Sequence, residues 1–280
     1  MNGSDFDDIH DLDFHELHST VEAQTPLINA LTNEVTVNDV ANCTLHWGGL
    51  PVMSDDTREV ADMVSTADGC LLNMGTVSER GEEAMLKAGH AANEADVPVV
   101  VDPVGVGATP TRSAVADRLV TDLDVAIING NHAEITALAG EDADVRGVES
   151  IGEYADIAET AIACARRTDS VVVASGETDI VADAETAFEV DAGHPRMGTV
   201  VGTGCMLGAT LAVFAAGVDP LRAALAGTAA YGFAGEQAAA GEYGDFDGPA
   251  SYKIAFLDAV AGTDAEAELD VTDRIREVTN

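Results

Sequence analysis

The stretch Val97-Pro-Val-Val-Val-Asp-Pro-Val-Gly-Val-Gly-Ala108 decides the fold class of this chain. Its first half is a short apolar run rich in β-branched side chains, which is typical of a buried strand, and its second half is a proline- and glycine-containing loop. Similar runs occupy residues 70–73, 125–129 and 171–175. Helical spacing of apolar side chains, at i, i+3 and i+4, occupies residues 57–65, 79–94, 112–123 and 150–167. This alternation predicts an α/β fold with a central, largely parallel sheet flanked by helices.

The remaining segments complete the predicted organisation. Residues 179–190 favour two short strands joined by a turn, as a hairpin at the sheet edge, and residues 205–240 are strongly helical. There is no internal repeat and no linker long enough to separate two domains. We therefore expect one domain over residues 26–262. Residues 1–25 are expected to form an acidic, mobile leader, and residues 263–280 an acidic C-terminal helix or tail.

The charge of the chain excludes several classes of partner. The 280 residues include 50 acids and 13 bases, so the net charge is −37. Such a surface repels phosphate backbones and anionic lipids, which argues against nucleic acid and membrane surfaces as partners. No apolar run approaches the roughly 18 residues of a membrane span, and the acidic start is no signal peptide. A cytoplasmic location is the expectation.

The kind of acidity points to concentrated salt. Only Lys87 and Lys253 are lysines, and the other eleven bases are arginines. The self-repulsion of this net charge is tolerable near 1 M salt, where the Debye length falls to about 3 Å. A halophilic cytoplasm is the favoured interpretation, and an acidic protein of a low-salt cell is the alternative.

Ligands of parallel sheets bind beyond the carboxyl ends of the strands, so these ends are the first places to search. Asp102 ends one predicted strand, and Asn129-Gly-Asn-His-Ala-Glu134 ends the next. Val200-Val-Gly-Thr-Gly-Cys205 opens an apolar helix, where two glycines and free N–H groups favour a phosphate. The carboxylates of Asp102 and Glu134 facing this helix start predict a site for Mg²⁺ and a polyphosphate.

Each of these features also has a simpler interpretation. The glycines at 202 and 204 would serve equally as a tight turn into a core helix, and Asp102 as a turn former. Glu134 would fit the N3 position of a capping box whose cap is Asn131. The four cysteines lack a C-x-x-C spacing, so neither a zinc site nor a redox pair is indicated.

Seven segments, in order, carry a resemblance to a known family: residues 26–33, 49–54, 72–76, 101–110, 129–134, 202–205 and 248–252. On these segments the chain resembles the hydroxyethylthiazole kinases of the ribokinase-like superfamily, from about Pro26 to Val260. The resemblance implies a three-layer ribokinase-like fold. It also implies ATP-dependent phosphorylation of the hydroxyl of 4-methyl-5-(2-hydroxyethyl)thiazole in thiamine biosynthesis, with Mg²⁺ as cofactor. Family members form homotrimers with active sites between subunits, and apolar helices such as residues 207–216 would fit burial near such an interface.

The resemblance also assigns roles on the ATP side of the site. Asn131 and Glu134 match an N-x-x-E motif that holds Mg²⁺ and the ATP phosphates, and Asp102 matches an acid near the same metal. Ser175 stands where the family has a hydroxyl residue that contacts ATP. Asn129 is also expected to contact ATP, although it replaces an arginine that contacts the ATP phosphates in the family, which is a departure from the family pattern.

On the substrate side, Met53 matches a methionine that contacts the thiazole, and Asn33 and Val35 match residues beside the ring. Gly202, which is also expected to contact the substrate, and Gly204 match the glycines of an anion hole. Cys205 stands where most ribokinase-like enzymes have an aspartate base, and a cysteine there marks the thiazole kinases. These three catalytic assignments are what the resemblance implies.

Three interpretations of function compete. The first is a thiazole kinase that takes ATP and the small thiazole alcohol. The second is another ribokinase-like enzyme, such as a vitamin-precursor kinase or an ATP-dependent NAD(P)HX dehydratase, against which Cys205 argues. The third is a non-catalytic nucleotide-binding sensor, which only the missing arginine at position 129 supports.

Overall fold

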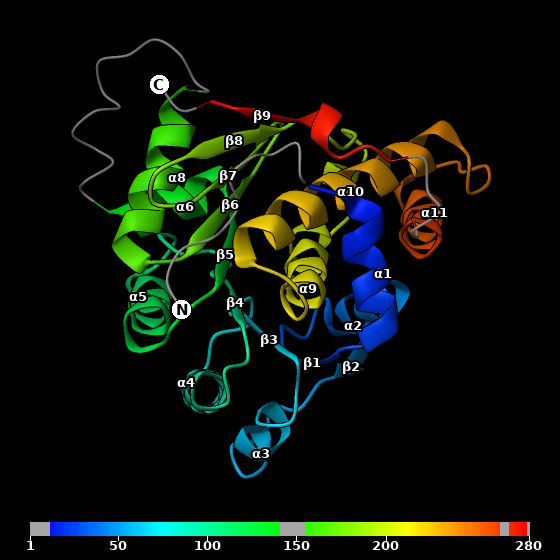
Figure 1. Cartoon of the computed structure of the whole chain (residues 1–280). Coiled ribbons are helices and arrows are strands. Elements are labelled where there is room, and N and C mark those ends of the chain that lie inside the picture. Colours follow the sequence, from blue (N-terminus) through cyan, green and yellow to red (C-terminus); the bar gives the residue numbers. More distant parts are fainter. Residues whose placement is uncertain (1–11, 141–154, 264–268, 279–280) are drawn as a thin grey trace.

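A nine-stranded sheet runs through the computed structural model, which describes residues 12–140, 155–263 and 269–278 (Figure 1). The strand order is β2-β1-β3-β4-β5-β6-β7-β8-β9, and all pairs from β2 to β6 are parallel while the pairs from β6 to β9 are antiparallel. The strands are β1 (Leu27–Leu31), β2 (Leu50–Val52), β3 (Gly69–Asn73), β4 (Val99–Asp102), β5 (Ile127–Asn131), β6 (Val171–Ser175), β7 (Asp179–Ala182), β8 (Ala187–Val190) and β9 (Ile275–Glu277). The predicted fold class is confirmed.

Helices cover both faces of the sheet and make three layers (Figure 1). One face carries α1 (Phe14–Gln24), α2 (Val37–His46), α9 (Thr203–Ala215), α10 (Pro220–Ala240) and α11 (Pro249–Gly262). The other carries α3 (Val60–Val64), α4 (Glu79–Glu94), α5 (Pro110–Asp122), α6 (His132–Ala139) and α8 (Ala155–Thr168). None of the helices in the described ranges combines the length and the apolarity that a membrane span requires.

The central helix α9 is buried by its own chain. Every residue from Met206 to Ala215 is buried, and α9 contacts β3, β4 and β5 on one side and α2 and α10 on the others. Gly208 permits the close approach to the sheet, since a Cβ there would lie 3.3 Å from the Leu71 side chain. The apolar side chains of this segment are therefore buried within the chain itself, and its place near a subunit interface stays a prediction.

Several predicted boundaries shift for local reasons. The long helix expected over residues 205–240 is two helices, because Asp219 caps α10 through the N–H groups of Leu221 and Arg222 and Pro220 begins it. The helix expected over residues 57–65 shrinks to α3. The predicted hairpin forms as β7 and β8, although β9 lies outside it. Residues 150–154 of another predicted helix lie outside the described residues.

The predicted N-terminal leader is wrong from residue 12 onward. Asp13 caps α1 by accepting the N–H groups of His15 and Glu16, and the apolar side chains of Phe14, Leu17 and Val21 are buried. The Phe14 ring lies 6.2 Å from the Phe214 ring of α9, so α1 is part of the core. Residues 1–11 lie outside the described part of the chain.

The predicted C-terminal helix or tail is also wrong where it is described. Residues 275–277 form β9, which pairs antiparallel with β8. Just before it, Arg274 makes a bidentate pair with Glu236 of α10, at 2.8 and 2.9 Å. This pair ties the last strand to the helical layer, while residues 264–268 and 279–280 lie outside the described residues.

Candidate active site

Parallel strands bring their carboxyl ends to one edge of the sheet, and most of the predicted site residues lie there. Asn33 follows β1 and Met53 follows β2, while Asp102 ends β4 and Ser175 ends β6. The start of α9 lies at the same edge, since the Asn33 amide nitrogen is 3.4 Å from the Cys205 sulfur. The fold therefore brings together residues that are far apart in the sequence.

The first turn of α9 has the geometry of an anion site. Gly202 is its N-cap with φ 94°, a left-handed conformation that favours glycine, and a Cβ there would lie 2.6 Å from the Thr36 methyl. Gly204 is exposed, with no atom within 4 Å of where its Cβ would lie. The Tyr231 hydroxyl donates to the Thr203 carbonyl at 2.7 Å and fixes the turn. The N–H groups of a helix start suit a phosphate.

The half-buried Cys205 and the buried Asp102 form the base of this site. Burial and then the Asp102 charge raise the pKa of the Cys205 thiol, against hydrogen bonds from Thr36, Asn73 and Asn33. Burial and then the Glu134 charge raise the pKa of Asp102, which is 3% exposed. Cys205 is therefore a neutral thiol at neutral pH, in spite of its place at a helix start.

Three hydrogen-bonded side chains lie at the base of this site. They are those of Asn33, Asn73 and Asp102, and we call this set the amide chain. The Asn73 amide donates to Asp102 Oδ2 at 2.5 Å, and its carbonyl accepts from Asn33 at 3.0 Å. Asn73 was not among the predicted site residues, because it ends β3 as an ordinary polar residue would. Only the register between β3 and β4 indicates that Asn73 belongs to the site, because it pairs Asn73 directly with Asp102.

Glu134 is the N3 residue of a capping box, as the simpler interpretation expected. Its Oε2 accepts the Asn131 N–H at 2.8 Å, while Asn131 Oδ1 accepts the Glu134 N–H at 2.9 Å. Its Oε1 accepts the Gly105 N–H at 2.7 Å. Glu134 thus ties the glycine loop after β4 to α6.

The same carboxylates fit a magnesium ion. In the described residues no three metal-binding side chains gather closely enough to hold an ion alone. Mg²⁺ needs only one or two carboxylates, since water and ATP phosphates supply the rest. Asp102 and Glu134 lie close enough for the charge of one to raise the pKa of the other, and a cation would relieve that repulsion.

Asn129 lies beneath the start of α9. It is 1% exposed, and its amide donates to the Gly204 carbonyl at 3.0 Å. Among the described residues its carbonyl oxygen has no hydrogen-bond partner. The expected contact of Asn129 with ATP stays a prediction. Ser175 is half-buried at the end of β6, with its hydroxyl 3.4 Å from the Gly130 carbonyl.

Two buried hydrogen bonds fix the loop that carries Met53. The Asn29 carboxamide accepts the Ser54 N–H and donates to the Ser54 carbonyl, both at 3.2 Å, which pins the residue next to Met53 to β1. Val35, by contrast, is 73% exposed, so this chain alone does not enclose a ring there.

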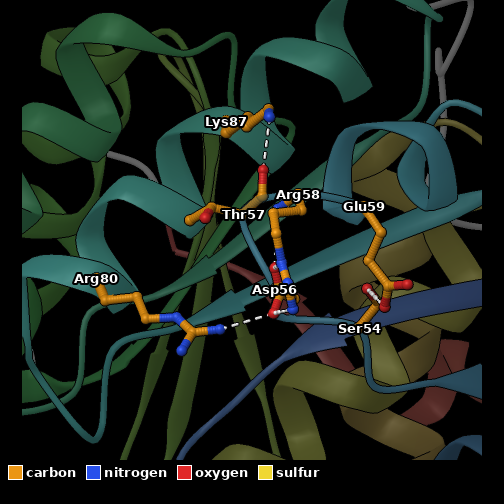
Figure 2. Close-up of polar contacts among 7 residues, drawn as sticks. All are labelled: Ser54, Asp56, Thr57, Arg58, Glu59, Arg80 and Lys87. Atoms are coloured by element: carbon orange, nitrogen blue, oxygen red, sulfur yellow. Dashed lines mark hydrogen bonds and ion pairs between the residues drawn. The ribbon is translucent and has the colours of Figure 1, made fainter.

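Figure 2 shows the outer side of this loop, where Asp56, Arg58 and Arg80 form what we call the arginine cluster. Arg58 pairs with Asp56 through two nitrogens, at 2.8 and 2.7 Å, and Arg80 of α4 adds a third bond at 2.9 Å. The hydrogen bonds from Arg58 hold the pKa of Asp56 well below its usual range. Two turns further along α4, Lys87 donates to the Thr57 carbonyl at 2.5 Å. The helix thus holds the loop at two points.

Comparisons with known proteins agree on one family. The model of the hydroxyethylthiazole kinase family matches residues 18–266. A relative from Natronomonas pharaonis named hydroxyethylthiazole kinase is 69% identical over 92% of this chain and 93% of its own. The solved hydroxyethylthiazole kinase of Pyrococcus horikoshii OT3 superposes with TM-score 0.82 at 31% identity, over 95% of this chain and 99% of that one. A ribokinase-like protein of Enterococcus faecalis V583 shares the fold, with TM-score 0.61 at 13% identity and 89% of each chain covered.

Proposed function

The chain belongs to the hydroxyethylthiazole kinase family, and from that premise we propose how its residues divide the work of the reaction. The enzyme transfers a phosphoryl group from ATP to the hydroxyl of 4-methyl-5-(2-hydroxyethyl)thiazole, in thiamine biosynthesis. The first of the three interpretations is thereby confirmed. The observation that supports our division of roles is the start of α9, an open anion site beside the buried Asp102 and the half-buried Cys205.

The phosphoryl group is held mainly by backbone N–H groups. The N–H groups from Gly202 to Cys205 stabilise the charge that develops on the γ-phosphoryl oxygens, and Asn129 supports them from beneath through the Gly204 carbonyl. Asn131 and Ser175 lie at the neighbouring strand ends and contact ATP. Asp102 and Glu134 hold Mg²⁺, which neutralises phosphate charge when bound.

The alcohol occupies the other half of the site. Met53 contacts the thiazole ring from the loop after β2, and Asn33 lies between the ring and Cys205. The substrate hydroxyl lies beside Cys205. Because the thiol is neutral, it does not compete with the phosphate as a fixed thiolate would. It positions the hydroxyl, or acts as a weak, partner-assisted base that passes its own proton to Asp102 as it takes the proton of the hydroxyl.

A homotrimer would complete the alcohol site. Six large apolar side chains are exposed on the loops and elements around α2, at Val35, Val37, Leu45, Leu50, Val201 and Ile254. Exposed apolar groups of this kind mark association surfaces, and Val35 belongs to the predicted ring contacts. Light scattering of the protein in molar KCl tests this, and Leu45→Glu should yield monomers with a raised KM for the alcohol.

We also place the enzyme in a cytoplasm of high salt, on the net charge of −37 and the presence of only two lysines. A coupled ADP-release assay with the thiazole alcohol, in high and low KCl, tests activity and salt preference together. Alcohol-dependent ADP release that increases with KCl supports both proposals. Release that is independent of the alcohol would contradict the kinase assignment itself.

A further inference from the structure

Asn73 joins the two halves of the active site, although no role has been assigned to it. It is 3% exposed at the end of β3, between Asn33 on the alcohol side and Asp102 on the metal side. Its carboxamide bonds to both, at 3.0 Å and 2.5 Å. A buried amide with one partner in each half transmits any movement of one half to the other.

Backbone N–H groups fix the direction in which each amide points, because they can only donate. The Gly75 N–H donates to Asn73 Oδ1 at 3.0 Å, so the Asn73 nitrogen must face Asp102. The N–H groups of Val35 and Thr36 donate to Asn33 Oδ1 at 3.0 and 3.1 Å. The Asn33 nitrogen therefore faces Asn73 and, at 3.4 Å, the Cys205 sulfur.

Steric contact with Gly75 holds the Asn33 side chain in place as well. A Cβ on Gly75 would lie 2.7 Å from both Cβ and Nδ2 of Asn33, so the backbone after β3 packs directly on that carboxamide. The packing and the bond directions are independent observations. Both leave the Asn33 amide a single orientation, with an N–H aimed at Cys205.

We propose that Asn73 is a positioning residue that holds the Asn33 N–H donor toward the substrate hydroxyl and the Asp102 carboxylate toward the phosphates. This rests on the proposed place of the hydroxyl beside Cys205. Since Asn33 presents a donor, it stabilises negative charge that develops on the substrate oxygen and does not accept its proton.

A double-mutant cycle tests the proposal. Asn73→Leu keeps the size of the side chain but removes both polar atoms, and Asn33→Ala removes the donor. Each single variant should lose roughly 10- to 100-fold in kcat, with the KM for ATP within about threefold of wild type. Because the two residues act as one unit, the double variant should be no slower than the worse single variant. Asn73→Ser replaces Asn73→Leu in the cycle if the leucine variant does not fold.

Thr210→Val is the matched control, because it removes a buried hydrogen bond at 2.8 Å from Trp47, away from the amide chain. It should lower the melting temperature and leave kcat within about twofold. The proposal is overturned if Asn73→Leu keeps wild-type kcat, or if the losses of the two single variants multiply in the double variant. If Asn33→Ala itself has no effect, the proposed place of the hydroxyl is wrong too, whereas wild-type phosphorylation of the alcohol would still stand.

Discussion

The amide chain and the arginine cluster hold the same edge of the sheet by opposite means. The amide chain is buried, and two of its three members are neutral carboxamides whose partners leave them one orientation. The arginine cluster is exposed, with the Arg58 and Arg80 side chains 87% and 68% accessible (Figure 2). Salt screens exposed charges far more than buried hydrogen bonds. The reacting centre is therefore held by interactions that molar salt leaves intact, and ion pairs hold only the loop around it.

The largest expected effect distinguishes the contribution of the backbone N–H groups at the start of α9 from that of the Cys205 side chain. Gly204→Val should fold normally, since the space around its Cβ position is open, yet abolish turnover by blocking the phosphate. Cys205→Ser should keep measurable activity, because the N–H donors remain, and Cys205→Asp should be tolerated. Steady-state kcat with the thiazole alcohol checks all three. A dead Cys205→Ser beside an active Gly204→Val would assign the chemistry to the side chain.

Removing a metal carboxylate should come next in size. Glu134→Gln should lower kcat by roughly two orders of magnitude, with partial rescue by added Mg²⁺. Part of the loss is structural, because an amide cannot accept both the Gly105 and Asn131 N–H groups. Asp219→Ala, which removes only the α10 cap, should cost about 1 kcal/mol of stability without any dependence on Mg²⁺. Near-normal turnover of Glu134→Gln at limiting Mg²⁺ would leave Glu134 as a cap alone.

Salt should change the thermal stability of the whole fold. With a net charge of −37, the melting temperature should rise by about 10 °C or more between dilute buffer and molar KCl, because repulsion is then screened. Melting curves followed by circular dichroism at several KCl concentrations measure this. A melting temperature indifferent to KCl would remove the halophilic interpretation and leave the kinase assignment intact.

A smaller effect is expected in the arginine cluster. Asp56→Asn should raise the KM for the alcohol by about two- to fivefold with little change in kcat, because exposed ion pairs contribute little. The difference in this KM between Asp56→Asn and the wild type should become smaller in molar KCl. Asp117→Asn, which breaks a comparable exposed pair with Arg167 at 2.9 Å, should leave that KM unchanged. If the Asn73→Leu defect shrinks with salt as much as the Asp56→Asn defect, the contrast between the regions fails.

The last expected effect concerns a half-buried carboxyl outside both regions, that of Asp179. Burial raises the pKa of Asp179 to about 7, against the N–H of Gly176. The unfolded chain therefore ionises first as pH rises, so this residue lowers stability progressively between pH 4 and 7. Asp179→Asn should raise the free energy of unfolding at pH 8 by roughly 1–3 kcal/mol and have no effect at pH 3. Denaturant unfolding at the two pH values measures it, and equal stability of the two proteins at pH 8 would contradict it.

The sequence predicted the strand ends well and the partners between them poorly. Asp102 and Cys205 could be found because an acid after a valine run and a glycine turn before an apolar helix are local signals. Asn73 could not, because only the pairing of β3 with β4 gives it meaning. Asn129 was assigned from a family position, and no local pattern indicates that its amide bonds to the Gly204 carbonyl at the start of α9.

The chain ends were misjudged for a related reason. The acidic composition of residues 1–25 hides the apolar spacing of α1, which is buried against α9 and α10. β9 is only three residues long and has no recognisable pattern of its own. Both segments are held by contacts with residues far away in the sequence, and a local sequence pattern does not predict such contacts.

The contact between Phe14 and Phe214 has a consequence for how the protein is made. These rings lie roughly 200 residues apart along the chain, so α1 leaves the ribosome long before α9 exists to cover it. Until then its apolar stripe is an exposed surface open to chaperones or to aggregation. Charged residues beside an apolar segment oppose its aggregation, and Asp13, Glu16 and Glu22 stand beside this stripe.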